Sequence, residues 1–141
     1  MPIEGPVLAL DVGERRIGVA VSDPSGAFAF PHDTLERTNV RDDVAAIVVL
    51  ARERDARTIV VGDPLTMDGK RGIAAEKMDA FVAHLARAYD GTIARIDERL
   101  TTAAVQKSLI GADVSRAKRK TVVDKLAAAM ILETYLARNR R

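Results

Sequence analysis

The sequence predicts an α/β fold with a mixed five-stranded sheet and helices on both faces. Short apolar segments with strand-like alternation come first, within residues 7–35, and strand-like and helical segments alternate after them. The first group indicates antiparallel strands, whereas the alternation indicates parallel strands joined by right-handed helical crossovers. With 141 residues, 48% of them hydrophobic, we expect one domain spanning residues 1–141.

The first three strands are expected at residues 7–11, 16–22 and 28–35. A Gly-Glu pair forms the turn between the first two, which predicts a hairpin. Pro31 interrupts the third segment. Because proline lacks an N–H donor, this strand suits an edge of the sheet better than its centre.

Strands and helices alternate in the rest of the chain. The expected elements are a helix capped by Asn39, a strand at 58–61, a helix at about 73–89, a strand at 92–96, a short helix capped by Thr101, and a last helix at roughly 121–137. The expected inward residues are Val44, Ile47, Val48 and Ala51 in the first helix, Ala74, Met78, Phe81, Leu85 and Tyr89 in the second, and Val123, Leu126, Ala127, Met130 and Ile131 in the last.

Composition excludes several kinds of site. The chain has no cysteine, and its two histidines, His32 and His84, lie far apart, so a thiolate zinc site or a cysteine nucleophile is excluded. A metal ion would have oxygen ligands, which favours magnesium, manganese or calcium. The longest unbroken apolar run is too short for a membrane span, and the N-terminus lacks a signal-peptide pattern, so we expect a cytoplasmic protein without membrane contact.

Acidic residues end two strand-like segments. Asp11 follows an apolar run, and Asp97 and Glu98 follow another. By strand alternation, Asp11 and Glu98 share faces with apolar residues, where an ionised carboxylate needs a partner, and a shared metal ion would serve both. Glu98 is favoured over Asp97 as the inward ligand, although a one-residue bulge would exchange them. Asp11 with the following Val-Gly fits an ordinary hairpin turn equally well.

Asp124 is a third candidate acid. It precedes two alanines by three and four residues and Ile131 by seven, which places it on a small inward helix face. The spacing from Thr121 also fits a capping box, and on spacing alone the cap is slightly favoured. A helix beginning well before Thr121 would exclude that interpretation.

Basic residues gather in two places. The loop from Gly62 to Gly72 contains Lys70 and Arg71 and fits an active-site rim better than a Walker A motif, whose spacing it lacks. A second cluster lies at Arg116, Lys118, Arg119, Lys120 and Lys125. Clusters of this kind bind phosphates, but solvated loops show them as well, and the net charge of +2 says little about a polyanionic partner.

Four segments in this order resemble the YqgF family, also called RuvX, of Holliday junction resolvases and pre-16S rRNA nucleases with a ribonuclease H-like fold. The segments begin at Ala9, Val61, Asp97 and Val123. The resemblance implies an acidic triad at Asp11, Glu98 and Asp124, and so makes Asp124 a metal ligand rather than a cap. One position departs from the family pattern: Asp63 stands where an apolar residue is usual.

Together with the resemblance, these inferences predict a nuclease that depends on Mg²⁺ or Mn²⁺ and hydrolyses phosphodiester bonds in nucleic acid. Its expected role is processing of the 5′ end of pre-16S rRNA in ribosome biogenesis, resolution of branched DNA, or both. Metal ions would activate the attacking water and stabilise the leaving 3′-oxygen. The residues expected to contact nucleic acid are Arg16, Lys70, Arg71, Arg99, Thr101, Lys118, Arg119 and Lys120.

Two alternatives remain open at this stage. One is a non-catalytic module that binds RNA or a ribosome-associated protein. The other is an actin-like ATPase, against which the chain length argues, because that architecture closes two such domains around its nucleotide. The protein could be a monomer or a homodimer, and resolution of a symmetric junction would need two sites.

Overall fold

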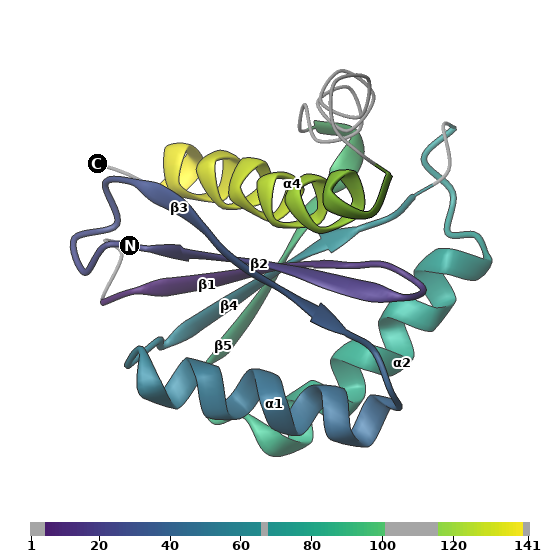
Figure 1. Ribbon diagram of the computed structural model, residues 1–141, viewed down its shortest axis with the longest axis horizontal. Coiled ribbons are helices and arrows are strands. Elements are labelled where there is room, and N and C mark those ends of the chain that lie inside the picture. The colour runs from purple at the N-terminus through teal and green to yellow at the C-terminus, as the bar shows by residue number, and fades with distance from the viewer. Residues whose placement is uncertain (1–4, 66–67, 101–115, 140–141) are drawn as a thin grey trace.

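The computed structural model describes residues 5–65, 68–100 and 116–139. Five strands form one mixed sheet in the order β3-β2-β1-β4-β5 (Figure 1). The strands are β1 (Val7–Val12), β2 (Arg16–Ser22), β3 (Ala29–Glu36), β4 (Thr58–Asp63) and β5 (Thr92–Asp97). β1, β2 and β3 pair antiparallel, and β4 and β5 run parallel to β1. The predicted mixed sheet is confirmed, with β3 at one edge.

Helices cover both faces of this sheet, as predicted. The helices are α1 (Val40–Glu53), α2 (Ile73–Ala88), the 3-10 turn η1 (Glu98–Leu100) and α4 (Arg116–Asn139). Figure 1 shows α1 and α2 on one face and α4 on the other. The helix expected after Thr101 lies outside the described residues. Within the described ranges, no helix combines the length and the apolar character that crossing a membrane requires.

The start of α1 follows from its sequence. The side chain of Asn39 accepts a hydrogen bond from the backbone N–H of Asp42 at 2.9 Å, which satisfies a donor that the first helical turn leaves unpaired. This confirms the predicted N-cap.

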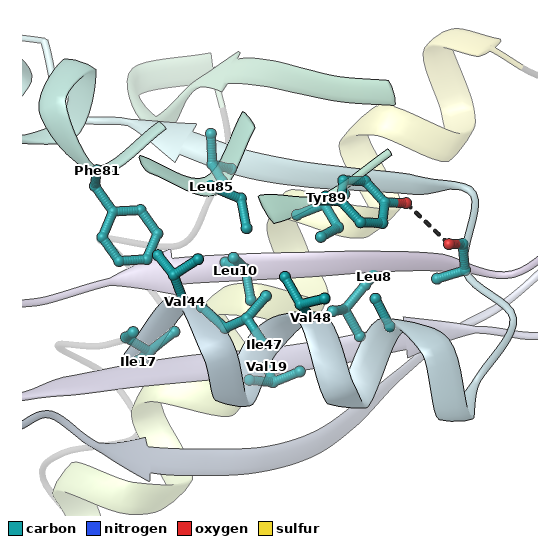
Figure 2. Packing of buried hydrophobic residues seen from close by; sticks show 14 of the residues in the cluster. Leu8, Leu10, Ile17, Val19, Val44, Ile47, Val48, Phe81, Leu85 and Tyr89 are labelled. Atoms are coloured by element: carbon teal, nitrogen blue, oxygen red, sulfur yellow. Dashed lines mark hydrogen bonds between the residues drawn. The ribbon is translucent and has the colours of Figure 1, made fainter. Parts of the chain in front are cut away.

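The core between the sheet and α1 and α2 consists of large side chains. Figure 2 shows Leu8, Leu10 and Ile17 from the sheet against Ile47 of α1 and Leu85 of α2. The predicted stripe of α1 is buried throughout. In α2 the prediction is wrong at one position, because Ala74 is exposed and its neighbour Ala75 is buried.

The core on the α4 side is built from smaller residues of the sheet. Ala9, Ala20 and Val60 meet Ala128 and Ile131 of the helix. The helix begins at Arg116, five residues before the predicted start. Its inward stripe also differs from the prediction: Leu126 and Met130 are only half-buried, and Ala128, Leu132 and Leu136 are buried. The side chain of Val123 lies outside the described part.

Tyr89 offers a test of the large-residue core. Its hydroxyl donates to the buried carbonyl oxygen of Ala56 at 2.9 Å (Figure 2). Tyr89→Phe should therefore lower the free energy of unfolding by about 1 kcal/mol, measured by urea denaturation at neutral pH.

Burial raises the pKa of Tyr89 from 10.0 to about 12, so the folded state holds this proton more tightly than the unfolded chain. The resulting stability is complete below about pH 10 and is lost as the pH rises towards about 12.

The Tyr89→Phe variant should therefore lose less stability than the wild type as the pH rises from about 10 to about 12. Tyr135→Phe, a half-buried tyrosine of α4, is the matched control. Equal losses of stability for the two variants, or an unchanged alkaline profile for Tyr89→Phe, would contradict the prediction.

Candidate active site

Asp11 lies in β1 on the face that α4 covers. It alternates with Val7 and Ala9, which belong to the small-residue core, and its relative exposure is 5%. Its neighbour in β2 is Gly18. On the other side, the pairing of β1 with β4 runs to Leu10 and Val61, so Gly62 is the next residue along β4. Asp11 is thus a buried carboxylate with a glycine on either side in the sheet.

Gly18 lets α4 approach the sheet at Asp124. A Cβ atom on Gly18 would overlap the backbone carbonyl of Asp124 and lie 2.9 Å from the backbone nitrogen of Lys125. The side chain of Asp124 accepts a hydrogen bond from Nε of Arg16 at 3.1 Å. Since α4 begins five residues before Thr121, Asp124 is not the N3 residue of a capping box. The structure therefore places Asp124 beside the strand pair that carries Asp11.

Gly62 makes the corresponding space for Glu98. A Cβ atom on Gly62 would lie 2.8 Å from both Cγ and Oε1 of Glu98, and 2.7 Å from Cδ1 of Ile131 in α4. Glu98 therefore lies over β4 on the α4 face, next to the position of Asp11. The three predicted acids come from β1, η1 and α4 and lie towards the same end of this face, with Asp124 over Gly18 and Glu98 over Gly62.

Asp97 is engaged in a different interaction. Its carboxylate accepts from the backbone and side chain of Arg99, with the shortest distance, 2.7 Å, to Nη2. The hydrogen bond from the Arg99 guanidinium lowers the pKa of Asp97 below its ordinary value. The guanidinium also lies 3.4 Å from the Cβ position of Gly69. Arg99 thus links the end of β5 to the loop before α2.

The donor chemistry of the three acids fits a hard divalent cation, because carboxylate oxygens are the ligands that Mg²⁺ and Mn²⁺ prefer. In the described part of the chain, however, no three His, Asp or Glu side chains are grouped closely enough to hold a metal ion. The contact between Arg16 and Asp124 offers a physical reason. A guanidinium satisfies a carboxylate that would otherwise face other carboxylates.

A charged network lies on the opposite face of the sheet. Asp63, with a relative exposure of 8%, accepts from Arg71 at 2.9 Å and from Arg95 at 3.0 Å. Asp79 of α2 also pairs with both arginines, and Arg71 donates to the carbonyl oxygen of Ala75. The network ties the end of β4, the loop after it, β5 and α2 together. In the sequence, Asp63 departs from the family pattern, but no local signal there indicates these partners.

The remaining residues predicted to contact nucleic acid either lie away from the three acids or fall outside the described part. Lys70 is 83% exposed and lies 3.9 Å from Asp68. Arg71, bound in the network, remains a predicted substrate contact, although its observed contacts hold the loop. Thr101 and the side chains of Lys118, Arg119 and Lys120 lie outside the described part.

The order of the sheet and the helices on both of its faces define a protein of ribonuclease H-like fold. The family model described as "RuvX: Holliday junction resolvase" matches residues 5–138. The chain belongs to this RuvX family. It is accordingly a hydrolase that acts on nucleic acid.

Similar proteins agree with this assignment. A protein of Nitrobacter hamburgensis, named "Putative pre-16S rRNA nuclease", is 45% identical over 97% of this chain and 84% of its own length. One of Halalkalibacterium halodurans with the same name is 47% identical over 93% of this chain and 95% of its own length. Among solved structures, Thermus thermophilus RuvC in complex with a Holliday junction substrate has a TM-score of 0.58 at 14% identity, covering 96% of both chains. At that identity the likeness supports the fold alone.

The two glycines under the acids give a matched pair of variants. Gly18→Ala places a methyl group against the backbone of α4 and should cost about 1–3 kcal/mol of stability, because the helix must move. The atoms nearest to a methyl group at Gly62 belong to the side chains of Glu98 and Ile131, which can rotate, so the cost of Gly62→Ala should be smaller. Both should reduce nuclease activity, one by moving Asp124 and the other by moving Glu98. Thermal unfolding would test the order, and equal stability losses would contradict it.

The charged network predicts that Asp63 holds the loop. Asp63→Asn or Asp79→Asn should speed amide hydrogen exchange at residues 68–72 severalfold, since Arg71 loses charged partners. Asp90→Asn, an exposed carboxylate after α2, is the control. Unchanged exchange in both network variants would show that the loop is held by other contacts.

Proposed function

We propose that this protein is a divalent-metal-dependent nuclease whose substrate is the precursor of 16S rRNA. The proposal is supported by the placement of Asp124 over Gly18 and of Glu98 over Gly62, the two glycines that flank Asp11 in the sheet. Asp11 is buried, and Glu98 and Asp124 are half-buried on the same face. Carboxylates from three elements that lie on one face of small residues favour a cation as a shared partner. The names of the relatives supply the substrate class.

Each acid has a distinct support in this arrangement. Asp11 is held by strand pairing, Glu98 by the turn that follows β5, and Asp124 by a helix that glycine allows onto the sheet. Together they would hold Mg²⁺ or Mn²⁺, which when bound activates water and stabilises the negative charge of the leaving oxygen. Arg16 would then be free to contact a substrate phosphate beside the site, with Arg99 and the exposed Lys70 further along the rim.

Cleavage assays with matched substrates test the proposal. Single-stranded RNA carrying the 16S precursor boundary and a four-way DNA junction are each incubated with Mn²⁺, Mg²⁺ or EDTA. Asp11→Asn and Glu98→Gln should each lower the cleavage rate by about a hundredfold or more, since a bound metal supplies several kcal/mol of transition-state stabilisation. Both should also weaken Mn²⁺ binding, measured by electron paramagnetic resonance. Glu53→Gln, an exposed carboxylate at the end of α1, should leave both unchanged.

The possible outcomes test the identity of the substrate and the occurrence of cleavage separately. If the protein cuts the DNA junction in preference to RNA and needs a metal ion to do so, the proposed nuclease activity stands and the proposed substrate is wrong. RNA binding without cleavage by any variant would overturn the proposal in favour of a non-catalytic binding module.

A further inference from the structure

A cavity of about 610 Å³ lies on the face of the sheet opposite the acids. It is bounded by the β1–β2 turn, the residue after β4, the start of α1 and one side of α2, and Figure 1 shows these elements at the same end of the sheet. A volume of this size is typical of small-molecule sites. No part of the proposed cleavage chemistry uses it.

The lining of the cavity combines an apolar floor with basic groups. Val12, Val40, Met78 and Phe81 provide apolar surface, and Ile73 stands at its edge with 74% of its surface exposed. The basic groups are Arg37, Lys77 and His84, against one acid, Glu14. This combination suits a ligand with an apolar body and a negative charge.

One wall of the cavity is fixed in place. Arg37 donates to the carbonyl oxygen of Gly13 at 2.8 Å and to the carboxylate of Asp43 at 3.1 Å. Its guanidinium lies over the ring of Phe81, 5.5 Å from the centroid. These contacts hold Arg37 as an ordered part of the wall, with its charge offset by Asp43, so this wall need not rearrange when a ligand binds.

The cavity adjoins the proposed active site along the chain. Val12 follows Asp11 in β1, and successive strand residues point to opposite faces, so the acids and the cavity share one edge of the sheet. A nucleic-acid strand lying at the acids and crossing the β1–β2 turn would reach the cavity. This continuity favours part of the substrate as the occupant over an unrelated small molecule.

We propose that the cavity is a subsite for one unpaired nucleotide of the substrate strand, with its base on the apolar floor and its phosphate at Lys77 and His84. The subsite rests on the proposed function, because it extends the same substrate. It would give the enzyme a preference for substrates with an unpaired nucleotide on one side of the cleaved bond.

Filling the cavity is the sharpest test. Ala80 of α2 is exposed and lines the cavity, so Ala80→Leu should fill the cavity with little effect on folding. The control is Ala83→Leu, because Ala83 is an exposed alanine of the same helix that does not line the cavity. Lys77→Gln removes the charge as a second variant. Binding of single-stranded RNA is measured in EDTA, with one abasic nucleotide placed at successive positions around the cleavage point.

In the wild type, an abasic nucleotide at one position should weaken binding about tenfold, as expected when one base no longer buries its surface on the apolar floor. Ala80→Leu should bind intact RNA about tenfold more weakly and be indifferent to that abasic position, whereas Ala83→Leu should behave as the wild type. The same abasic penalty in Ala80→Leu as in the wild type would overturn the subsite.

A titration with adenosine 5′-monophosphate, followed by the NMR signal of the Ile73 methyl group, separates this proposal from the cleavage proposal. A signal change that Ala80→Leu abolishes would support the subsite even if no RNA is cut. If cleavage depends on metal, but an abasic nucleotide does not weaken RNA binding and adenosine 5′-monophosphate does not change the NMR signal, the proposed nuclease activity stands and the proposed subsite is wrong. Binding of an apolar dye but of no nucleotide would also overturn it.

Discussion

The close approach of α4 to the sheet is the constraint on which the acidic site depends. Gly18 leaves no side chain between β2 and the backbone of Asp124, and alanines on both surfaces continue the contact along the helix. A larger residue at Gly18 would hold α4 away from β1. The position of Asp124, 113 residues after Asp11 in the chain, is thus set by the absence of a methyl group.

Charge at this end of the sheet is divided between its two faces. On the α4 face, Arg16 pairs with Asp124, and Asp11 and Glu98 lie on the same face. On the other face, two arginines join Asp63 and Asp79 in a network whose charges offset one another. A balanced network suits a structural role, whereas carboxylates that three separate elements bring to one face suit a site that binds a cation.

The sequence was sufficient for the strands and for the face on which Asp11 lies, because alternation in a strand is a local property. The cap at Asn39 was predictable for the same reason. Alternation does not explain the position of Glu98, because β5 ends at Asp97 and Glu98 begins the turn η1. Asp124 was ambiguous, since a capping box and an inward helix position share one spacing, and only the family resemblance favoured the second. The network of Asp63 was not predictable at all, because its partners meet only after β4, β5 and α2 have packed together.

The two cores contribute differently: the core under α1 and α2 supplies more hydrophobic stabilisation, and the core under α4 carries the acids. Large residues such as Leu10 and Ile59 are fully buried on the α1 and α2 face, where each contributes about 1.5–3 kcal/mol by leaving water. The α4 face has alanine and glycine in the sheet, so less apolar area is buried there for each strand residue. That loss is the structural consequence of bringing a helix close enough to add a third carboxylate. A chain with one strongly packed face can tolerate it, and the acids therefore lie on the face that contributes less to the hydrophobic core.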